Sequence, residues 1–187
     1  RLFKVQLLIL LITMIKQINS INITSGVKNI IFINVLVFFI IEISNISDLK
    51  YLVFIKYFSL IPSETIFNLQ IWRVFTYIFI HGDFLHLFFN LLILFFIGCE
   101  VERQLGTKLF YIYYLVCGVG GGCLVSILGY NSIDSIIGSS GSIFGLLYSL
   151  SVLRPNSKVY LYFIFPMKIS TLVNIVAISS LFGVILL

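Results

Sequence analysis

The sequence predicts an all-α fold, a polytopic transmembrane helical bundle, and three observations support this. Hydrophobic residues make up 60% of the chain, charged residues make up only 10%, and the mean hydropathy is +1.13. The apolar residues form long runs that do not alternate with polar ones. Because lipid cannot hydrogen-bond to exposed backbone groups, such runs must be helices or a closed barrel, and their lack of alternation excludes a barrel.

Five apolar stretches approach the roughly 20 residues that a helix needs to cross a bilayer. They cover residues 30–43, 84–97, 109–128, 137–153 and 169–187. Arg154 and Pro155 follow the fourth stretch and Pro166 precedes the fifth, and both charge and proline favour the end of a helix. The short stretch at residues 5–15 is a signal-like segment or the remnant of an earlier span, and we leave it unassigned.

The basic residues indicate how the spans are oriented, because cytoplasmic loops carry an excess of Lys and Arg. Alternating the sides leaves only Lys50, Lys56 and Arg73 on one side. The other side holds the remaining basic residues, Arg1, Lys4, Lys16, Lys28, Arg103, Lys108, Arg154, Lys158 and Lys168. The sequence therefore predicts a cytoplasmic amino terminus and a long external loop at residues 45–76, whose aromatic part suits the headgroup layer.

Charge and composition argue against several functions. The net charge is +5, but the basic residues are scattered singly between apolar runs, so no nucleic-acid partner is expected. His81, Asp83 and His86 lack a further ligand cluster, so we expect no metal site. No nucleotide or flavin motif is present, and we expect no cofactor.

A histidine and an asparagine open the second span, where polar groups are costly and each is a functional candidate. His86 and Asn90 are four residues apart, so they share one face of a helix, and His81 lies just before them. The structural alternative is that the pair forms hydrogen bonds to a neighbouring helix.

A serine flanked by glycines opens the fourth span, in the run from Gly138 through Ser139 and Ser140 to Gly141. Glycine exposes a neighbouring hydroxyl and leaves backbone N–H groups free to bind an oxyanion. Gly141 and Gly145 are four residues apart, which lets another helix approach closely. Close packing of small residues is the alternative explanation.

Two further motifs are Trp72-Arg73 in the external loop and Gly98 with Glu102 at the end of the second span. Glu102 is either part of a solvated helix end or a fixed link to another span.

In order and approximate spacing, these motifs resemble those of the rhomboid family of intramembrane serine proteases. The resemblance is carried by Trp72, Arg73, His81, His86, Asn90, Gly98, Glu102, Gly138, Ser140, Gly141 and Gly145. It implies a rhomboid-like core of six spans, of which this sequence contains five. We therefore expect residues 1–26 to form an amino-terminal segment and residues 27–187 to form a rhomboid-like membrane domain truncated before the sixth span.

The resemblance also implies roles for these residues. Ser140 would be the nucleophile that attacks a transmembrane segment of another protein in the lipid bilayer, and His86 and Asn90 would donate to the oxyanion. Glu102 would tie spans together at the cytoplasmic end. The general base would be a histidine on the sixth span, expected beyond Leu187, so the sequence as given should be inactive.

Two other functions and one other base remain as alternatives. An inactive rhomboid-like protein that binds or escorts membrane clients would lack the distal histidine. A transporter or channel component would show inverted repeats, and none is found. His86 is the other candidate base, but one imidazole serves poorly as both base and oxyanion donor. The oligomeric state and the host membrane are not predicted.

Overall fold

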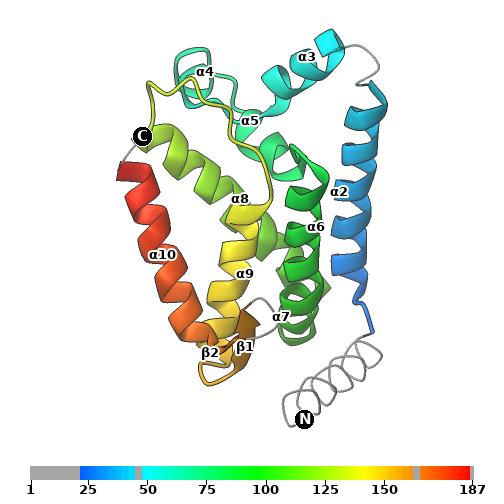
Figure 1. Cartoon of the computed structure of the whole chain (residues 1–187), viewed down its shortest axis with the longest axis vertical. Helices are drawn as coiled ribbons and strands as arrows, with labels where there is room; N and C mark the ends of the chain where they lie inside the picture. Colours follow the sequence, from blue (N-terminus) through cyan, green and yellow to red (C-terminus); the bar gives the residue numbers. More distant parts are fainter. Residues whose placement is uncertain (1–21, 45–47, 162–164, 186–187) are drawn as a thin grey trace, which may run out of the picture.

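The computed structural model describes residues 22–44, 48–161 and 165–185. Most of the amino-terminal segment assigned above lies outside these residues. Within them the chain forms a helical bundle with one small hairpin, which confirms the predicted all-α membrane fold (Figure 1).

Three helices in the described part of the chain are long and apolar enough to cross a membrane. They are Ser25–Ile43, Phe84–Leu105 and Thr107–Leu128. The first belongs to α2 (Ser25–Ser44), and the third is α8 (Thr107–Leu128). Two shorter apolar helices, α9 (Ser140–Leu153) and α10 (Ile169–Ile185), correspond to the fourth and fifth predicted spans.

The second span contains three helical segments in succession. These are α6 (Phe84–Ile93), the π-helical turn η2 (Leu94–Gly98) and α7 (Cys99–Leu105). Asp83 caps the start, since its carboxylate accepts from the His86 backbone N–H at 2.8 Å. The span ends eight residues later than predicted, because the charged residues after Gly98 continue the helix instead of ending it.

Gly98 lies where α2 crosses the second span. A Cβ on Gly98 would stand 3.0 Å from the Val27 side chain of α2. The absence of a side chain therefore allows the two helices to approach closely.

The predicted external loop is structured and lies at one end of the bundle, at the top of Figure 1. It contains α3 (Asp48–Phe58), α4 (Pro62–Phe67), α5 (Arg73–Thr76) and the 3₁₀ turn η1 (Tyr77–Phe79). At the opposite end, β1 (Lys158–Leu161) and β2 (Phe165–Lys168) form an antiparallel hairpin between α9 and α10. The sequence analysis did not predict this hairpin.

The bundle core is formed by large side chains from α8, α9, η1 and η2. Phe110, Tyr114, Ile78, Leu94 and Leu146 are each fully buried. Large apolar side chains also point outward, including Phe32, Ile43, Val116, Ile127 and Val152. An apolar exterior around a packed core is what a helical bundle immersed in lipid requires.

Candidate active site

The segment before α9 is held against the external loop by backbone hydrogen bonds. Leu60 and Ile136 pair in an antiparallel bridge, with N–H to O distances of 2.9 and 2.8 Å. The Ser63 N–H donates to the Ser132 carbonyl at 3.0 Å. The external loop therefore fixes the path of the chain into the first turn of α9.

Tyr77 joins the external loop to both α8 and the serine segment. Its backbone carbonyl accepts from the Gly138 N–H at 2.9 Å, and its hydroxyl donates to the Gly118 carbonyl at 2.7 Å. A Cβ on Gly122 would lie 2.9 Å from its ring. Sequence reasoning missed Tyr77, because one aromatic residue in an aromatic-rich segment gives no distinctive signal.

The structure brings His86 and Asn90 next to Gly138, two residues before Ser140. A Cβ on Gly138 would lie 2.7 Å from His86 Nε2 and 3.9 Å from Asn90 Nδ2. Gly138 has φ +109°, a conformation that L side chains rarely adopt. Ser140 is exposed at the first residue of α9.

Two buried polar residues, Asn90 and His81, lie next to His86. Asn90 is buried, and its amide donates to the His86 carbonyl at 3.0 Å. His81 is 1% exposed, and its ring centroid lies 5.1 Å from that of His86. Burial, reinforced by the nearby His86, lowers the pKa of His81 to about 4, against a weaker opposing effect of Asp83. His81 is therefore neutral at physiological pH.

The helix α9 is shorter than the thickness of a typical hydrocarbon core. Its 14 residues span about 21 Å at the α-helical rise. The hydrocarbon core is about 30 Å thick. A helix of this length with its Arg154 end at one bilayer surface would therefore not reach the other surface.

The predicted close approach at Gly141 and Gly145 is made by α8. A Cβ on Gly141 would lie 3.8 Å from the Gly118 Cα, and one on Gly145 would lie 2.3 Å from the Cys117 sulfur. The Tyr113 hydroxyl donates to the Gly145 carbonyl at 2.9 Å. Glycines on one face of α9 therefore set the spacing of the two helices behind Ser140.

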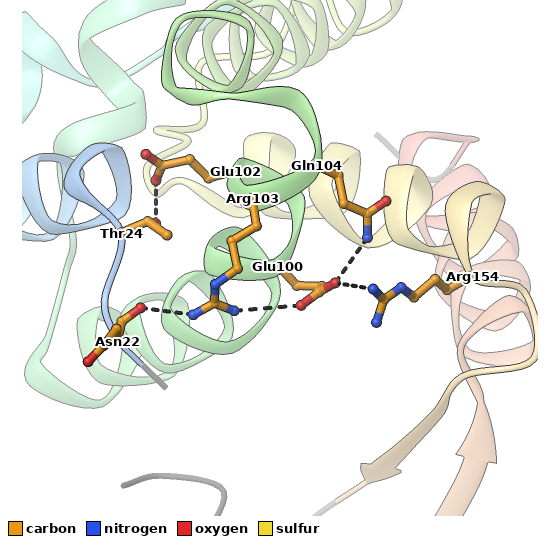
Figure 2. Close-up of polar contacts among 7 residues, drawn as sticks. All are labelled: Asn22, Thr24, Glu100, Glu102, Arg103, Gln104 and Arg154. Carbon is orange, nitrogen blue, oxygen red and sulfur yellow. Dashed lines mark hydrogen bonds and ion pairs between the residues drawn. The ribbon is translucent and has the colours of Figure 1, made fainter. Parts of the chain in front are cut away.

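Glu102 links the second span to the start of α2, at the end of the bundle away from Ser140. Its carboxylate accepts from the backbone N–H groups of Gly26 and Val27 and from the Thr107 hydroxyl, each at 2.8 Å. It also accepts from the Thr24 hydroxyl, the contact drawn in Figure 2. The negative charge sits at the positive end of the α2 dipole, so it satisfies the helix terminus electrostatically as well as by hydrogen bonds.

A second polar group at the same end connects α7 to α9. Figure 2 shows Glu100 between two arginines, with Arg154 Nη2 at 2.8 Å and Arg103 Nη1 at 3.6 Å. Gln104 donates to the same carboxylate at 3.0 Å. These side chains are partly or fully exposed, so each ion pair contributes little by itself.

Trp72 and Arg73 hold the end of α3 against α5. The Trp72 indole donates to the Tyr57 carbonyl at 3.1 Å, and Arg73 Nη1 donates to the Ser59 carbonyl at 2.6 Å. Arg73 is 2% exposed, and burial lowers the pKa of its guanidinium, although the charge of Glu64 opposes this. The pair contacts the backbone of the external loop rather than Ser140.

Metal ligands do not gather at this site. Across residues 22–44, 48–161 and 165–185, no group of three or more His, Cys, Asp or Glu side chains is placed to hold a metal ion.

The fold and this geometry define a multi-pass membrane protein in which Gly138, two residues before the serine that opens a short helix, lies next to a histidine and an amide. A family model described as Rhomboid domain matches residues 68–187, well over half of the chain. The protein belongs to this family.

Curated relatives agree with this assignment. RHOMBOID-like protein 1 of Arabidopsis thaliana is 34% identical over 117 residues, which cover 62% of this chain and 29% of that protein. Rhomboid protease GluP of Bacillus subtilis (strain 168) is 37% identical over 91 residues, covering 48% of this chain and 17% of that protein. Inactive RHOMBOID-like protein 8 of Arabidopsis thaliana is 36% identical over 94 residues, which cover 50% of this chain and 26% of that protein. The chain thus matches less than a third of the length of these relatives.

Proposed function

We propose that this protein is an intramembrane serine endopeptidase that cleaves transmembrane segments of other membrane proteins, with Ser140 as nucleophile. The observation that carries the proposal is the contact of His86 with Gly138, two residues before Ser140. On this proposal the Ser140 hydroxyl, the His86 imidazole and the Asn90 amide act together below the membrane surface. Such a group is expensive in lipid and is expected to have a function.

In the proposed reaction the Ser140 oxygen attacks the carbonyl carbon of the scissile peptide bond. The serine proton passes to a histidine base on a further span, which the family resemblance implies beyond Leu187. The C–N bond then breaks, and the same histidine returns the proton to the leaving amine. Water, activated by that histidine, hydrolyses the acyl-enzyme and regenerates Ser140.

The oxyanion of the tetrahedral intermediate would be stabilised by three kinds of donor. The Ser140 backbone N–H lies in the first turn of α9, where N–H groups have no partner within the helix. His86 Nε2 and Asn90 Nδ2 lie next to Gly138 and would be the side-chain donors. The positive end of the α9 dipole adds to their effect.

The proposal is tested by reaction of the full-length protein, in detergent, with a serine-reactive fluorophosphonate probe. We expect labelling that is lost in Ser140→Ala and retained in Ser151→Ala, a matched change near the other end of α9. Cleavage of a reporter transmembrane segment in proteoliposomes should be lost in the same variant. A folded wild-type protein that neither reacts nor cleaves would contradict the proposal.

A second candidate function is the binding of membrane clients without proteolysis, as an inactive member of the family. It is favoured by the similarity to Inactive RHOMBOID-like protein 8. On this account Ser140→Ala would capture a transmembrane client as well as the wild type does, and neither would react with the probe. The labelling experiment therefore separates the two functions.

A further inference from the structure

Two lysines lie opposite each other on the hairpin that joins α9 to α10. Lys158 in β1 and Lys168 in β2 are partners in the antiparallel register, and both are exposed. Like charges directly opposite each other on two strands are destabilising. The sheet has two strands in the described part of the chain, and a two-stranded hairpin by itself is only marginally stable in water. The hairpin therefore contains a repulsion that it has little stability to offset.

The end of the hairpin that carries the lysines is fixed to the bundle. The Ile169 N–H, at the start of α10, donates to the Ser157 carbonyl at 3.0 Å, and Ile169 is fully buried. Val159 packs against the hydrophobic core. Because successive side chains of a strand point to opposite faces, Lys158 lies on the face of β1 away from the core, and the register puts Lys168 on the same face. The two charges are therefore held close together on the surface.

The lysine pair has no anionic partner in the part of the chain that the structure describes. The ion pairs formed there both use Glu100, which contacts Arg103 and Arg154. At the same end of the bundle, the Glu102 carboxylate instead accepts from the backbone at the start of α2 and from the Thr107 hydroxyl. The charge of the lysine pair is thus left for an anion from outside the chain.

The lysine pair lies where two apolar helices meet the hairpin. The helix α9 ends at Leu153, and α10 begins at Ile169, directly after Lys168. Figure 1 shows the hairpin beside the adjoining ends of α9 and α10, at the end of the bundle away from the external loop. Apolar helices of a membrane protein end near the lipid headgroups, whose phosphates are negatively charged. The positive end of the α10 dipole adds to the charge of the lysines.

A lipid phosphate matches this site in charge and in hydrogen bonding. Each lysine ammonium offers three donors and no acceptor, and phosphate oxygens accept from several donors at once. Lysine also has a long apolar stem, which suits the boundary between acyl chains and headgroups. The distribution of basic residues predicts that this end of the bundle is cytoplasmic, and the cytoplasmic leaflet contains anionic lipids.

We propose that Lys158 and Lys168 together bind the phosphate of an anionic phospholipid at the membrane surface beside the hairpin. The phosphate lies between the two ammonium groups, accepts hydrogen bonds from both and removes their mutual repulsion. The bound lipid thereby stabilises the hairpin and the junction between α9 and α10. The site does not depend on the proposed protease function, because it lies beyond the end of α9 opposite to Ser140.

Reversing one charge separates lipid binding from the stability of the hairpin. Lys158→Glu places opposite charges across the two strands, so it should stabilise the hairpin in neutral detergent and remove the lipid site. Lys168→Gln is a second variant, which removes the repulsion without adding a negative charge. Lys108→Glu is the matched control, because Lys108 is exposed near the start of α8 and its reversal changes the net charge equally.

The experiment is thermal unfolding of the full-length protein in dodecyl maltoside micelles, titrated with phosphatidylglycerol or with phosphatidylcholine. The wild-type midpoint should rise with phosphatidylglycerol and stay unchanged with phosphatidylcholine. Without lipid, Lys158→Glu should unfold at a higher temperature than the wild type. Its apparent Kd for phosphatidylglycerol, read from the titration, should be weaker by about tenfold or more. Lys168→Gln should weaken binding in the same direction, and Lys108→Glu should bind as the wild type does.

Four results would overturn the proposal. They are equal rises with the two lipids, a wild-type response in Lys158→Glu and Lys168→Gln, an equal loss of binding in Lys108→Glu, and a rise that inorganic phosphate reproduces without lipid. The third would indicate diffuse attraction to an anionic surface, and the fourth a soluble anion. Unfolding requires no catalysis, so absence of probe labelling at Ser140 would contradict the protease function and leave the lipid site standing.

Discussion

The imidazole of His86 lies directly against Gly138, with its Nε2 atom 2.7 Å from the position that a Cβ would occupy. Gly138 also has φ +109°, so both its backbone conformation and the space around it require glycine. Its N–H is fixed to the Tyr77 carbonyl. Gly138 therefore leaves the space that the His86 imidazole occupies, two residues before Ser140.

Gly138→Ala should strongly slow labelling of Ser140 while leaving the fold intact. The added methyl group would displace His86, and the strained backbone would cost about 2 kcal/mol. We expect at least a hundredfold slower reaction with a fluorophosphonate, measured on protein that still unfolds cooperatively. Gly120→Ala is the control, because a Cβ there meets nothing within 4 Å. Wild-type reactivity of Gly138→Ala would show that the contact is not required.

Glu102→Gln should destabilise the protein, because the carboxylate accepts four hydrogen bonds at the start of α2 and α8. Hydrogen bonds to charged groups contribute about 1.5–3 kcal/mol each, and the amide retains only some of them. We expect a loss of about 2–4 kcal/mol in the free energy of unfolding, read from thermal or denaturant unfolding in detergent. Glu100→Gln, which removes two solvent-accessible ion pairs, should cost less than about 1 kcal/mol. Equal effects of the two changes would refute the buried role of Glu102.

Much of the fold follows from apolar run length, because helices are the simplest way to satisfy the backbone in lipid. All five predicted spans correspond to helices, and Asn90, His86 and Gly138 were identified because polar groups and glycines at membrane depth are conspicuous. The predicted boundaries differ from the observed ones, most of all at the end of the second span. The cap that Asp83 provides to α6 is a local feature that a sequence can reveal. The contact of Glu102 with the start of α2, in the part of the second span that continues past Gly98, joins residues far apart in sequence.

Other features of the site gave no readable signal. Tyr77 matters through its backbone carbonyl and through glycines on α8, neither of which a sequence pattern reveals. The hairpin of β1 and β2 is only four residues per strand, too short for a reliable alternation. Asn34 is a buried polar residue in the middle of the first span. It meets the same criterion that identified Asn90, but it was not among the predicted candidates.

Gly145→Ala should push α9 away from α8, because the new Cβ would lie 2.3 Å from the Cys117 sulfur and 2.5 Å from its Cβ. Overpacking of this kind typically costs about 1–3 kcal/mol. We expect a lower unfolding midpoint and slower labelling of Ser140. Adding Cys117→Gly removes both clashing atoms and should recover most of the loss. If the double variant is no more stable than Gly145→Ala alone, the two residues do not set the helix spacing.

His81 should make the protein less stable at acidic pH. Its pKa is about 4 in the folded protein and 6.5 as a free side chain, so the unfolded chain binds a proton that the folded protein excludes. The free energy of unfolding is therefore unaffected by His81 protonation above pH 6.5. It falls as the pH drops from 6.5 towards 4, by up to about 3 kcal/mol. Unfolding midpoints at pH 7.5 and 5.0 should therefore differ less in His81→Phe than in the wild type. An identical pH dependence in the two proteins would mean that His81 is not buried as described.

The most direct test of the active-site geometry is a crystal structure of the full-length protein after reaction with a fluorophosphonate. We predict a covalent bond from the phosphorus to Ser140 Oγ, with the phosphonyl oxygen about 2.7–3.1 Å from the Ser140 N–H and from His86 Nε2 or Asn90 Nδ2. An adduct whose phosphonyl oxygen points away from both His86 and Asn90, or an adduct on another serine, would contradict the account.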